Sequence, residues 1–358
     1  MPYKYNLIHH VKSVYACLPR FRAVATIDYG NFAMEVRARN RYYQFHAQFA
    51  YREEGRLRFS PQLAPNARGF VGWLPYFNKR WDAAIDKLSF KQFCVTQKLN
   101  TPPYWLSGLE KLRDIIIKPR KASFAVGIRG PFREIDGSSP AHALREGEYY
   151  ERYVSGQIAK AWYWNGKLVC LELREMPSVT GDGTSALRQL ADAQRSPALG
   201  EPEWDSVDTL LEFQGASLVT VPSPGKRFAV DFRYGSALYP MNLENSNVLA
   251  QYSGTTVAEQ LGIAGPICLQ AIPGAIRPQT VFSLDAIVDS NNIVWLLEMN
   301  CNPTLHPDIY LPMFEALFGP PEPPRVGNEQ VLSVGYGSAL PGLSPAIQLP
   351  QHVHSGLI

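Results

Sequence analysis

This 358-residue sequence lacks the signals of a membrane protein, a disulfide framework or a zinc site. No run of about eighteen apolar residues occurs anywhere, so we expect no transmembrane helix and no membrane partner. The N-terminal stretch MPYKYNLIHHVKSVYACLPR has no long apolar core, and we therefore predict no signal peptide. The five cysteines are scattered singly, without C-x-x-C spacing, which argues against structural zinc and disulfides and suits a cytoplasmic location.

A strong excess of one charge is also missing. The formal net charge is only +3, which is too weak to predict binding to nucleic acid or to an anionic membrane surface. It is compatible with anionic small molecules, which need only local positive groups. The hydrophobic content of 46% and the charged content of 19% are typical of a globular protein. The length allows one composite enzyme or about two to three domains.

Polar residues inside two apolar runs are the most informative feature that is present. The segment Val281–Pro307, VFSLDAIVDSNNIVWLLEMNCNPTLHP, is predicted to form a β-hairpin, because the polar turn DSNN separates two apolar runs. Glu298 and Asn300 are two residues apart on the second strand, so both side chains leave the same face. One alternative is that Glu298 simply ends a surface strand. Against it, carboxylates and amides are costly to bury unless they hold something.

The register of this hairpin decides whether Asp285 joins the same face. If the turn is centred between Ser290 and Asn291, Asp285 lies opposite Leu296, which shares the face of Glu298. The two carboxylates are then diagonal neighbours, close enough to reach one cation. A shift of one residue would turn Asp285 to the other face. Carboxylate and amide oxygens suit Mg²⁺, which takes its remaining ligands from phosphates and water.

The run LLEMNCNP, after a strand that carries Asp285, resembles the C-terminal end of the ATP-grasp fold. In that superfamily the Asp, Glu and Asn of a D…E-x-N pattern bind the magnesium of Mg-ATP. The resemblance therefore implies ATP and Mg²⁺ as cofactors, with Asp285, Glu298 and Asn300 as the metal ligands. The implied fold class is α/β (α+β), in which two α/β subdomains clasp ATP beside a small N-terminal domain.

A predicted helix upstream carries the next motif. The segment WDAAIDKLSFKQFCVTQKLNTPP has helical periodicity and ends at two prolines. Its apolar stripe is predicted to contain Ile85, Leu88, Phe93 and Val95. The pair Asp86–Lys87 resembles the D-K entry to the ATP-grasp nucleotide domain, which implies that Lys87 contacts ATP. The alternative is that this pair is only the solvated end of a helix.

A buried lysine is predicted next. The apolar run Ile115–Ile117 indicates a short strand that ends at Lys118-Pro119. A lysine at the end of a buried strand needs a counter-charge, which a nucleotide phosphate would supply. The K-P pair is similar to the phosphate-binding lysine of the family, although the following loop has fewer glycines than is usual there.

The run E-R-Y-V-x-G resembles the hinge at which ATP-grasp proteins hold adenine. The resemblance implies that Glu151 faces the adenine amino group and that the backbone of Tyr153 and Val154 pairs with the ring edge. The family usually has a ribose-binding carboxylate seven residues after the hinge Glu, and this sequence has Ile158 there. The next segment predicts a hairpin that turns at Asn165-Gly166.

Two further segments are similar to the cyanophycin synthetase and bifunctional glutathione synthetase branch of the superfamily. The first runs from Arg174 through REMPSVTGDGTSALRQL, and the second covers residues 210–245, with Arg233 on a predicted strand FAVDFRYGSAL. In that branch such arginines act on the phosphates, so Arg174 and Arg233 are the predicted catalytic residues. After them, TVAEQLGIAG (256–265) predicts a helix that stops at its last glycine.

Together these motifs predict three parts: an N-terminal domain (1–84), an ATP-grasp domain with nucleotide-binding and metal-binding halves (85–319), and a Pro/Gly-rich tail (320–358). The implied activity is ATP-dependent carboxylate–amine ligation through an acyl phosphate, on a small carboxylate such as an amino acid or peptide and an amine. An ATP-grasp kinase acting on a hydroxyl is the first alternative, and a regulatory nucleotide-binding protein is the second. No nucleic-acid partner is predicted, and a homo-oligomer stays open.

Overall fold

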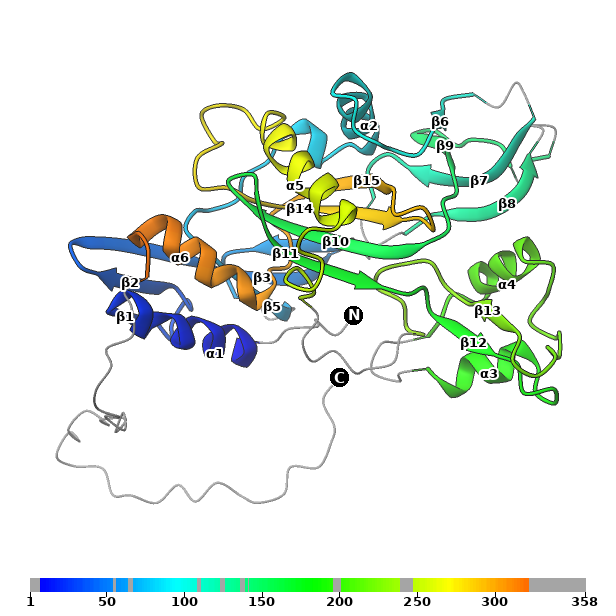
Figure 1. Ribbon diagram of the computed structural model, residues 1–358, viewed down its shortest axis with the longest axis horizontal. Helices are drawn as coiled ribbons and strands as arrows, with labels where there is room; N and C mark the ends of the chain where they lie inside the picture. Colours follow the sequence, from blue (N-terminus) through cyan, green and yellow to red (C-terminus); the bar gives the residue numbers. More distant parts are fainter. Residues whose placement is uncertain are drawn as a thin grey trace, which may run out of the picture.

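The computed structural model describes most of the chain, namely residues 7–53, 56–63, 67–107, 111–122, 126–135, 139–140, 142–195, 201–238 and 247–321. These residues form a mixed α/β structure, so the predicted fold class is confirmed (Figure 1). The predicted tail lies outside the described residues apart from its first two. Within the described ranges, no helix combines the length and the apolar character that crossing a bilayer requires.

The N-terminal part is an antiparallel sheet covered by helices. Its strands are β1 (Ala23–Ile27), β2 (Met34–Ala38), β3 (Arg41–Glu53), β4 (Arg56–Ser60) and β5 (Ala67–Leu74), with β5 beside β3. The sheet shares one core with α1 (Leu7–Cys17) and with α6 (Tyr310–Phe318), the last helix described. The two ends of the described chain are therefore packed together (Figure 1).

A second antiparallel sheet has the order β6-β9-β7-β8. Its strands are β6 (Tyr104–Trp105), β7 (Leu112–Pro119), β8 (Arg129–Ile135) and β9 (Glu148–Arg152). The predicted strand ending at Lys118-Pro119 is thereby confirmed. The helix before it in the chain is α2 (Lys87–Thr96), which follows a short 3₁₀ turn at Asp82–Ala84.

The central sheet has the order β11-β10-β14-β15 and is also antiparallel. Its strands are β10 (Gln157–Trp164), β11 (Lys167–Arg174), β14 (Val281–Val288) and β15 (Val294–Cys301), so both predicted hairpins are confirmed. Asn165 and Gly166 turn with φ of 50° and 79°, values that Asn and Gly tolerate best. One apolar face of the sheet packs against α5 (Thr256–Leu269) and α2.

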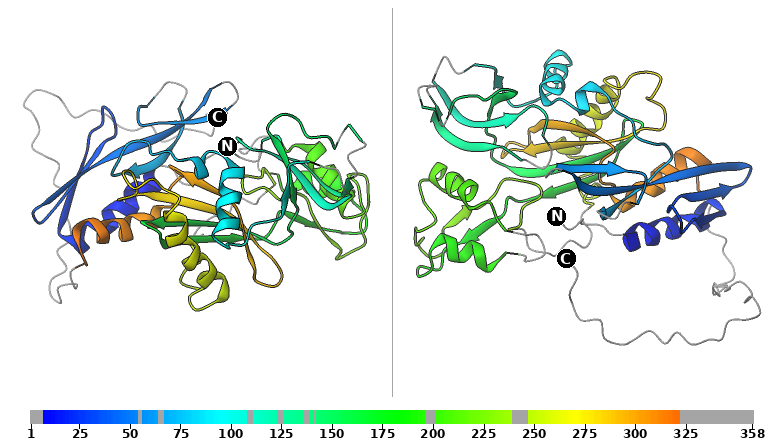
Figure 2. Two further views of the ribbon diagram at one scale, coloured as in Figure 1. Left: turned by 90° about the horizontal axis from the view of Figure 1, so that it is seen from above. Right: turned by 180° about the vertical axis from the view of Figure 1, so that it is seen from behind.

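A smaller unit follows β11. It consists of the strand pair β12 (Ser178–Thr180) and β13 (Arg227–Ala229) with α3 (Leu187–Ala193) and α4 (Trp204–Phe213), around a core of its own. Figures 1 and 2 show this unit and the β6–β9 sheet at the same end of the central sheet, away from the N-terminal sheet. Phe213 of α4 lies under the Arg133 guanidinium of β8, 5.3 Å from ring centroid to carbon, so the unit touches the second sheet.

Two helix predictions need correction, and the first concerns the buried face of α2. The buried residues are Leu88, Phe90, Lys91 and Cys94, whereas Ile85 and Val95 of the predicted stripe are 44% and 59% exposed. The face was misjudged because it includes a lysine. The helix also ends before the two prolines, at Thr96, and the chain turns at Lys98 with a φ of 57°.

The second correction concerns α5, which continues four residues past Gly265 and through Pro266. Close packing explains the glycine at position 265, which does not end the helix. A Cβ at this position would lie 2.1 Å from the carbonyl oxygen of Gly166, in the β10–β11 turn. The glycine lets the helix backbone approach the hairpin that its neighbouring residues cover.

Candidate active site

The register of β14 and β15 brings two carboxylates face to face. Val288 pairs with Val294, which centres the turn on Asn291, half a residue later than predicted. Continued without interruption, this register would turn Asp285 to the wrong face. A β-bulge next to Asp285 corrects it, so that Asp285 lies directly opposite Glu298. The predicted pairing with Leu296 is therefore wrong, while the predicted shared face is correct.

The same face carries a row of charged residues across all four strands. Lys160 of β10 pairs with Asp285 on one side and with Glu172 of β11 on the other, and Asp285 pairs with Glu298. The Lys160 Nζ lies 2.5 Å from Asp285 Oδ1. Asn300, one step along β15, donates its side-chain N–H to Asp285 Oδ2 at 3.1 Å. All three predicted metal ligands therefore meet at one point of the sheet.

Burial and neighbouring charges shift the pKa values of Asp285 and Glu298 in opposite directions. Burial raises the pKa of Asp285 to about 6 against the attraction of the Lys160 ammonium, and the Glu298 carboxylate adds to the increase. Burial also acts to raise the pKa of Glu298, but the Lys87 ammonium outweighs it and lowers that pKa to about 2. Both side chains remain 22% exposed, so solvent and ligands can reach them.

This donor set fits a magnesium ion that is shared with a ligand. Within the described residues no group of three or more His, Cys, Asp or Glu side chains gathers as a metal site. Asp285, Glu298 and Asn300 offer hard oxygen ligands, and Mg²⁺ is commonly bound by one or two carboxylates plus phosphates and water. The two ammonium groups that contact the carboxylates, Lys160 and Lys87, carry together the charge of one divalent cation.

Lys87 contacts the predicted metal ligand Glu298 from the start of α2. Its Nζ lies 2.8 Å from Glu298 Oε2 and also donates to the carbonyl oxygen of Ala122, in the loop after β7. Asp86 positions Lys87 by capping the helix, because its Oδ1 accepts a hydrogen bond from the Leu88 N–H at 2.9 Å. The other oxygen of Asp86 pairs with the Arg120 guanidinium. These contacts contradict the alternative that Asp86–Lys87 is only a solvated helix end.

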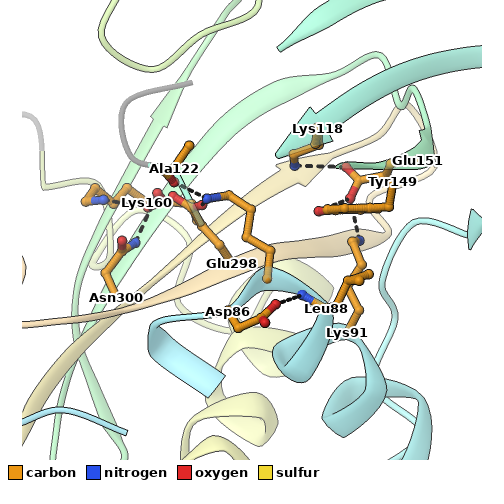
Figure 3. A network of polar contacts seen from close by, with 12 residues as sticks. Asp86, Leu88, Lys91, Lys118, Ala122, Tyr149, Glu151, Lys160, Glu298 and Asn300 are labelled. Carbon is orange, nitrogen blue, oxygen red and sulfur yellow. Dashed lines mark hydrogen bonds and ion pairs between the residues drawn. The ribbon is translucent and has the colours of Figure 1, made fainter. Parts of the chain in front are cut away.

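Lys118 and Glu151 form a buried pair in the second sheet. Lys118 Nζ lies 3.0 Å from Glu151 Oε1, and the other oxygen, Oε2, lies 2.6 Å from the Nζ of Lys91 in α2 (Figure 3). The counter-charge that Lys118 was predicted to need therefore comes from the protein. The Glu151 side chain is only 1% exposed, and both of its oxygens are taken by lysines, so the predicted contact with the adenine amino group has no free carboxylate oxygen here.

The predicted adenine hinge keeps one of its two backbone donors. The Tyr153 N–H donates to the carbonyl oxygen of Asp114 at 2.6 Å, because β9 and β7 pair for one residue beyond the strand. The Tyr153 N–H is therefore bonded within the protein, and the predicted pairing of this residue's backbone with adenine stays a prediction for its carbonyl oxygen. The Val154 N–H has no hydrogen-bond partner among the residues that the structure describes, so it remains the available donor.

An apolar cluster lies between the hinge and the central sheet. Ile158, where the family pattern has a ribose-binding carboxylate, is buried with Met176 and Ile287, and Tyr153 and Phe232 pack against them. Ile158 pairs with both Arg174 and Ile287, so the cluster continues the face that carries Asp285. A flat apolar ring has matching surroundings here, whereas a ribose hydroxyl has no carboxylate at position 158.

Arg174, one of the two predicted catalytic residues, lies beside the charged row. Its Nη2 lies 2.7 Å from Glu172 Oε2, and its guanidinium carbon lies 4.7 Å from the centre of the Tyr234 ring. The Tyr234 hydroxyl donates to the same Glu172 oxygen at 2.7 Å. Lys160 is 5.1 Å from that ring, so Tyr234 connects the small β12–β13 unit to the charged row.

Arg233 does not reach this group. It lies beyond β13 in a loop rather than on a strand, which corrects the predicted strand FAVDFRYGSAL. Its guanidinium is held within the small unit, 2.9 Å from Asp231 Oδ1 and 2.5 Å from Glu203 Oε2. The part of this predicted segment after Leu238 is outside the described residues until Asn247.

Two lysines of the site, Lys160 and Lys91, were missed. Lys160 stands alone in the apolar run AKAWYW, and an isolated charge in a central strand is a signal that could have found it. Lys91 follows Lys87 by four residues, so both lie on one side of α2. The K-x-x-x-K spacing after Asp86 was therefore readable, but the helix had been assigned an apolar stripe that left Lys91 out.

Neither a family model nor a curated protein matches the sequence. Among solved structures, the chain is similar to a bifunctional glutathione synthetase from Pasteurella multocida, with 12% identity, 88% of this chain, 44% of that chain and a TM-score of 0.39. A D-alanine–D-alanine ligase from Bacillus anthracis complexed with ATP has 13% identity and a TM-score of 0.34, and the match covers 66% of this chain and 66% of that chain. The ATP-grasp ligase PsnB complexed with a minimal precursor has 11% identity and a TM-score of 0.30, and the match covers 66% of this chain and 60% of that chain.

The chain thus spans less than two thirds of each of these three proteins. These similarities are distant, and with TM-scores below 0.5 they carry no argument about this chain. At these identities and TM-scores they say nothing of substrates, so the functional argument depends on the residues of the site.

Proposed function

We propose that this chain is an ATP-dependent carboxylate–amine ligase of the ATP-grasp type. One observation carries the proposal: Asp285, Glu298 and Asn300 converge on one sheet face, and Lys87 contacts Glu298 from the opposite element. Lys118 is close enough to contribute to the lowered pKa of Glu298. A site with two acidic groups, one amide and converging lysines suits a metal–triphosphate ligand, in which both signs of charge must be matched.

The proposed reaction has two steps. An oxygen of the substrate carboxylate attacks the γ-phosphorus of ATP, the bond to the β-phosphate oxygen breaks, and ADP leaves as an acyl phosphate forms. The amine nitrogen then attacks the acyl carbon, loses a proton, and expels inorganic phosphate to leave an amide. No covalent bond to the protein forms in either step.

The side chains would position and neutralise the reactants. Asp285, Glu298 and Asn300 would hold Mg²⁺, which when bound supplies positive charge to the phosphate oxygens. Lys87 and Lys118 would contact the phosphates, and the Val154 N–H would orient the base. Arg174, which contacts Glu172 of the charged row, would stabilise charge that develops during phosphoryl transfer. Arg233, held by two carboxylates, keeps no such role unless the small unit rearranges.

Hydroxylamine trapping tests the proposal. The purified chain is incubated with Mg-ATP, hydroxylamine and each of a panel of amino acids and dipeptides, and hydroxamate and ADP are measured. An acyl phosphate reacts with hydroxylamine, so the correct acid should give both products in equal amounts. Arg174→Ala should suppress both, with Arg188→Ala, in α3, as the matched control.

Two outcomes would contradict the ligase proposal. A stable phosphorylated product without hydroxamate or amide would indicate the kinase alternative. Nucleotide binding with no turnover on any acid of the panel, even with hydroxylamine, would favour the regulatory alternative.

A further inference from the structure

Two lysines one helical turn apart on α2 contact the two halves of the candidate site. Lys87 reaches Glu298 of β15, and Lys91 reaches Glu151 of β9. Residues four apart in a helix lie on one face, so the same short helix addresses both sheets. Lys91 has no role in the proposed reaction, yet it is fully buried at 0% exposure.

A buried ammonium has to be compensated, and the compensation of Lys91 is shared. Its Nζ lies 2.6 Å from Glu151 Oε2, 3.0 Å from Thr101 Oγ1 and 3.3 Å from the Pro102 carbonyl oxygen. Glu151 Oε1 is occupied by Lys118 at 3.0 Å. Two ammonium groups thus divide one carboxylate, which leaves about one net positive charge in this buried group.

The loop that holds Lys91 also contacts the strand of the metal ligands. The Thr101 hydroxyl donates to the Leu296 carbonyl oxygen at 2.8 Å, and the Leu296 N–H donates to the Asn100 carbonyl oxygen at 2.9 Å. Leu296 is two residues before Glu298. Lys91 therefore contacts the β6–β9 sheet through Glu151. Through Thr101 it is also linked to β15, the strand that carries Glu298.

We propose that Lys91 is a positioning residue of the nucleotide site, which keeps Glu151 from neutralising Lys118. Because Lys91 holds one carboxylate oxygen, the ammonium of Lys118 retains charge for a phosphate group. This inference rests on the proposed function, in which Lys118 contacts phosphate. Lys91 touches no substrate itself.

The proposal and a purely structural role of Lys91 predict opposite changes in nucleotide affinity when a second substitution is added. If Lys91 is replaced by an uncharged residue, Glu151 pairs with Lys118 alone and cancels its charge, so nucleotide affinity falls. If Glu151 is made neutral as well, Lys118 is released, so affinity recovers. A lysine that only filled space would give losses that add, and the double variant would bind most weakly.

The experiment is a double-mutant cycle of Mg-ADP binding by titration calorimetry, with thermal unfolding recorded in parallel. Lys91→Met should raise the Kd about tenfold, the usual order for losing a buried charge-assisted contact. Lys91→Met combined with Glu151→Gln should return to within about threefold of the wild type. The control is Lys98→Met, the same exchange at an exposed position just after α2, which should leave the Kd unchanged.

Each result decides one point. A Lys91→Met Kd equal to that of the wild type, or a double variant weaker than Lys91→Met, would overturn the inference and leave the proposed function intact. Wild-type protein that binds no Mg-ADP would overturn the proposed function itself. If Lys91→Met does not fold, Lys91→Gln replaces it under the same criteria, because glutamine is uncharged but still donates a hydrogen bond to Glu151.

Discussion

The two faces of the central sheet differ as strongly as any two regions of this molecule. On one face Ala159, Ala161 and Leu284 pack beneath α5 in an apolar cluster. On the other, Lys160 and Asp285, each one residue further along the same strands, belong to the charged row. Because strand side chains alternate between faces, the same strands build the core and the site.

The order of charges within the row shows what the second face is suited for. Glu172, Lys160 and Asp285 alternate in sign, as neighbours in a stable charged row should. Only Asp285 and Glu298 place like charges directly opposite each other. Opposed carboxylates repel each other, and here the ammonium groups of Lys160 and Lys87 compensate their charges. This pair is therefore the part of the face that is best suited to a bound cation.

The largest expected effect comes from removing one of these carboxylates. Glu298→Gln should abolish measurable turnover in the ligase assay while the unfolding free energy changes little, because a metal-binding charge is lost but the side-chain volume is kept. Glu259→Gln, at an exposed position on α5, is the control and should be fully active. Turnover of Glu298→Gln within about twofold of the wild type would end the metal assignment.

The apolar face should respond in the opposite way. Leu284 is fully buried under α5, and Leu284→Ala should lower the free energy of unfolding by about 2–5 kcal/mol, the usual cost of a cavity in a core. The fraction that stays folded should turn over at near the wild-type rate. Chemical denaturation and specific activity measure the two quantities. A large activity loss without destabilisation would show that the two faces are not separate in function.

A smaller effect tests how closely α5 lies on the sheet. A methyl group at Gly265 would meet the Gly166 carbonyl oxygen at 2.1 Å, so Gly265→Ala should cost about 1–3 kcal/mol of stability. Gly262→Ala is the control on the same helix, where nothing lies within 4 Å of the added Cβ, and it should stabilise by about 0.5–1 kcal/mol. Equal stability of the two variants, by thermal unfolding, would mean that the helix sits further from the hairpin.

The last effect concerns pH and the core that the N-terminal sheet shares with α6. Burial lowers the pKa of His10 from 6.5 to about 3, with smaller contributions from His306 and His9. Below pH 6.5 His10 binds a proton in the unfolded chain but not in the native protein. Stability present above that pH is thus lost as the pH falls toward 3, by up to about 1.4 kcal/mol per pH unit.

His10→Gln removes this titration. Its unfolding free energy should fall less steeply than that of the wild type between pH 6.5 and 4.5, although the variant loses stability at neutral pH because the contact with the Tyr310 hydroxyl changes. Denaturant unfolding at several pH values measures both slopes. Identical slopes would indicate that His10 is protonated in the native core.

The site was predictable where its residues follow a strand period. Glu298 and Asn300 share a face because of that period, whereas Asp285 joins them only through the pairing of β14 with β15. Their register was not predictable, since it depends on a turn centred half a residue later and on a bulge that compensates for it. Neither feature leaves a mark in the pattern of apolar residues.

Residues that act by pairing across elements were harder to predict. Lys118 was correctly placed at a strand end, but its partner Glu151 lies 33 positions away and was assigned to adenine instead. Lys91 was missed because a buried lysine resembles a break in an apolar stripe. Arg233 was expected in the site because its segment resembles the family branch. Its neighbour Tyr234 contacts Glu172 of the charged row instead, while the Arg233 guanidinium contacts Asp231. Only the fold decides such pairings.

The central claim is that Asp285 and Glu298 hold the metal of a bound nucleotide, and Mg²⁺ dependence of ADP binding tests it most directly. Calorimetric titrations of wild type and Glu298→Gln are made with Mg²⁺ and with excess chelator. The account predicts that Mg²⁺ tightens ADP binding to the wild type by about tenfold or more and has little effect on the variant. The same Mg²⁺ dependence in both proteins would contradict it.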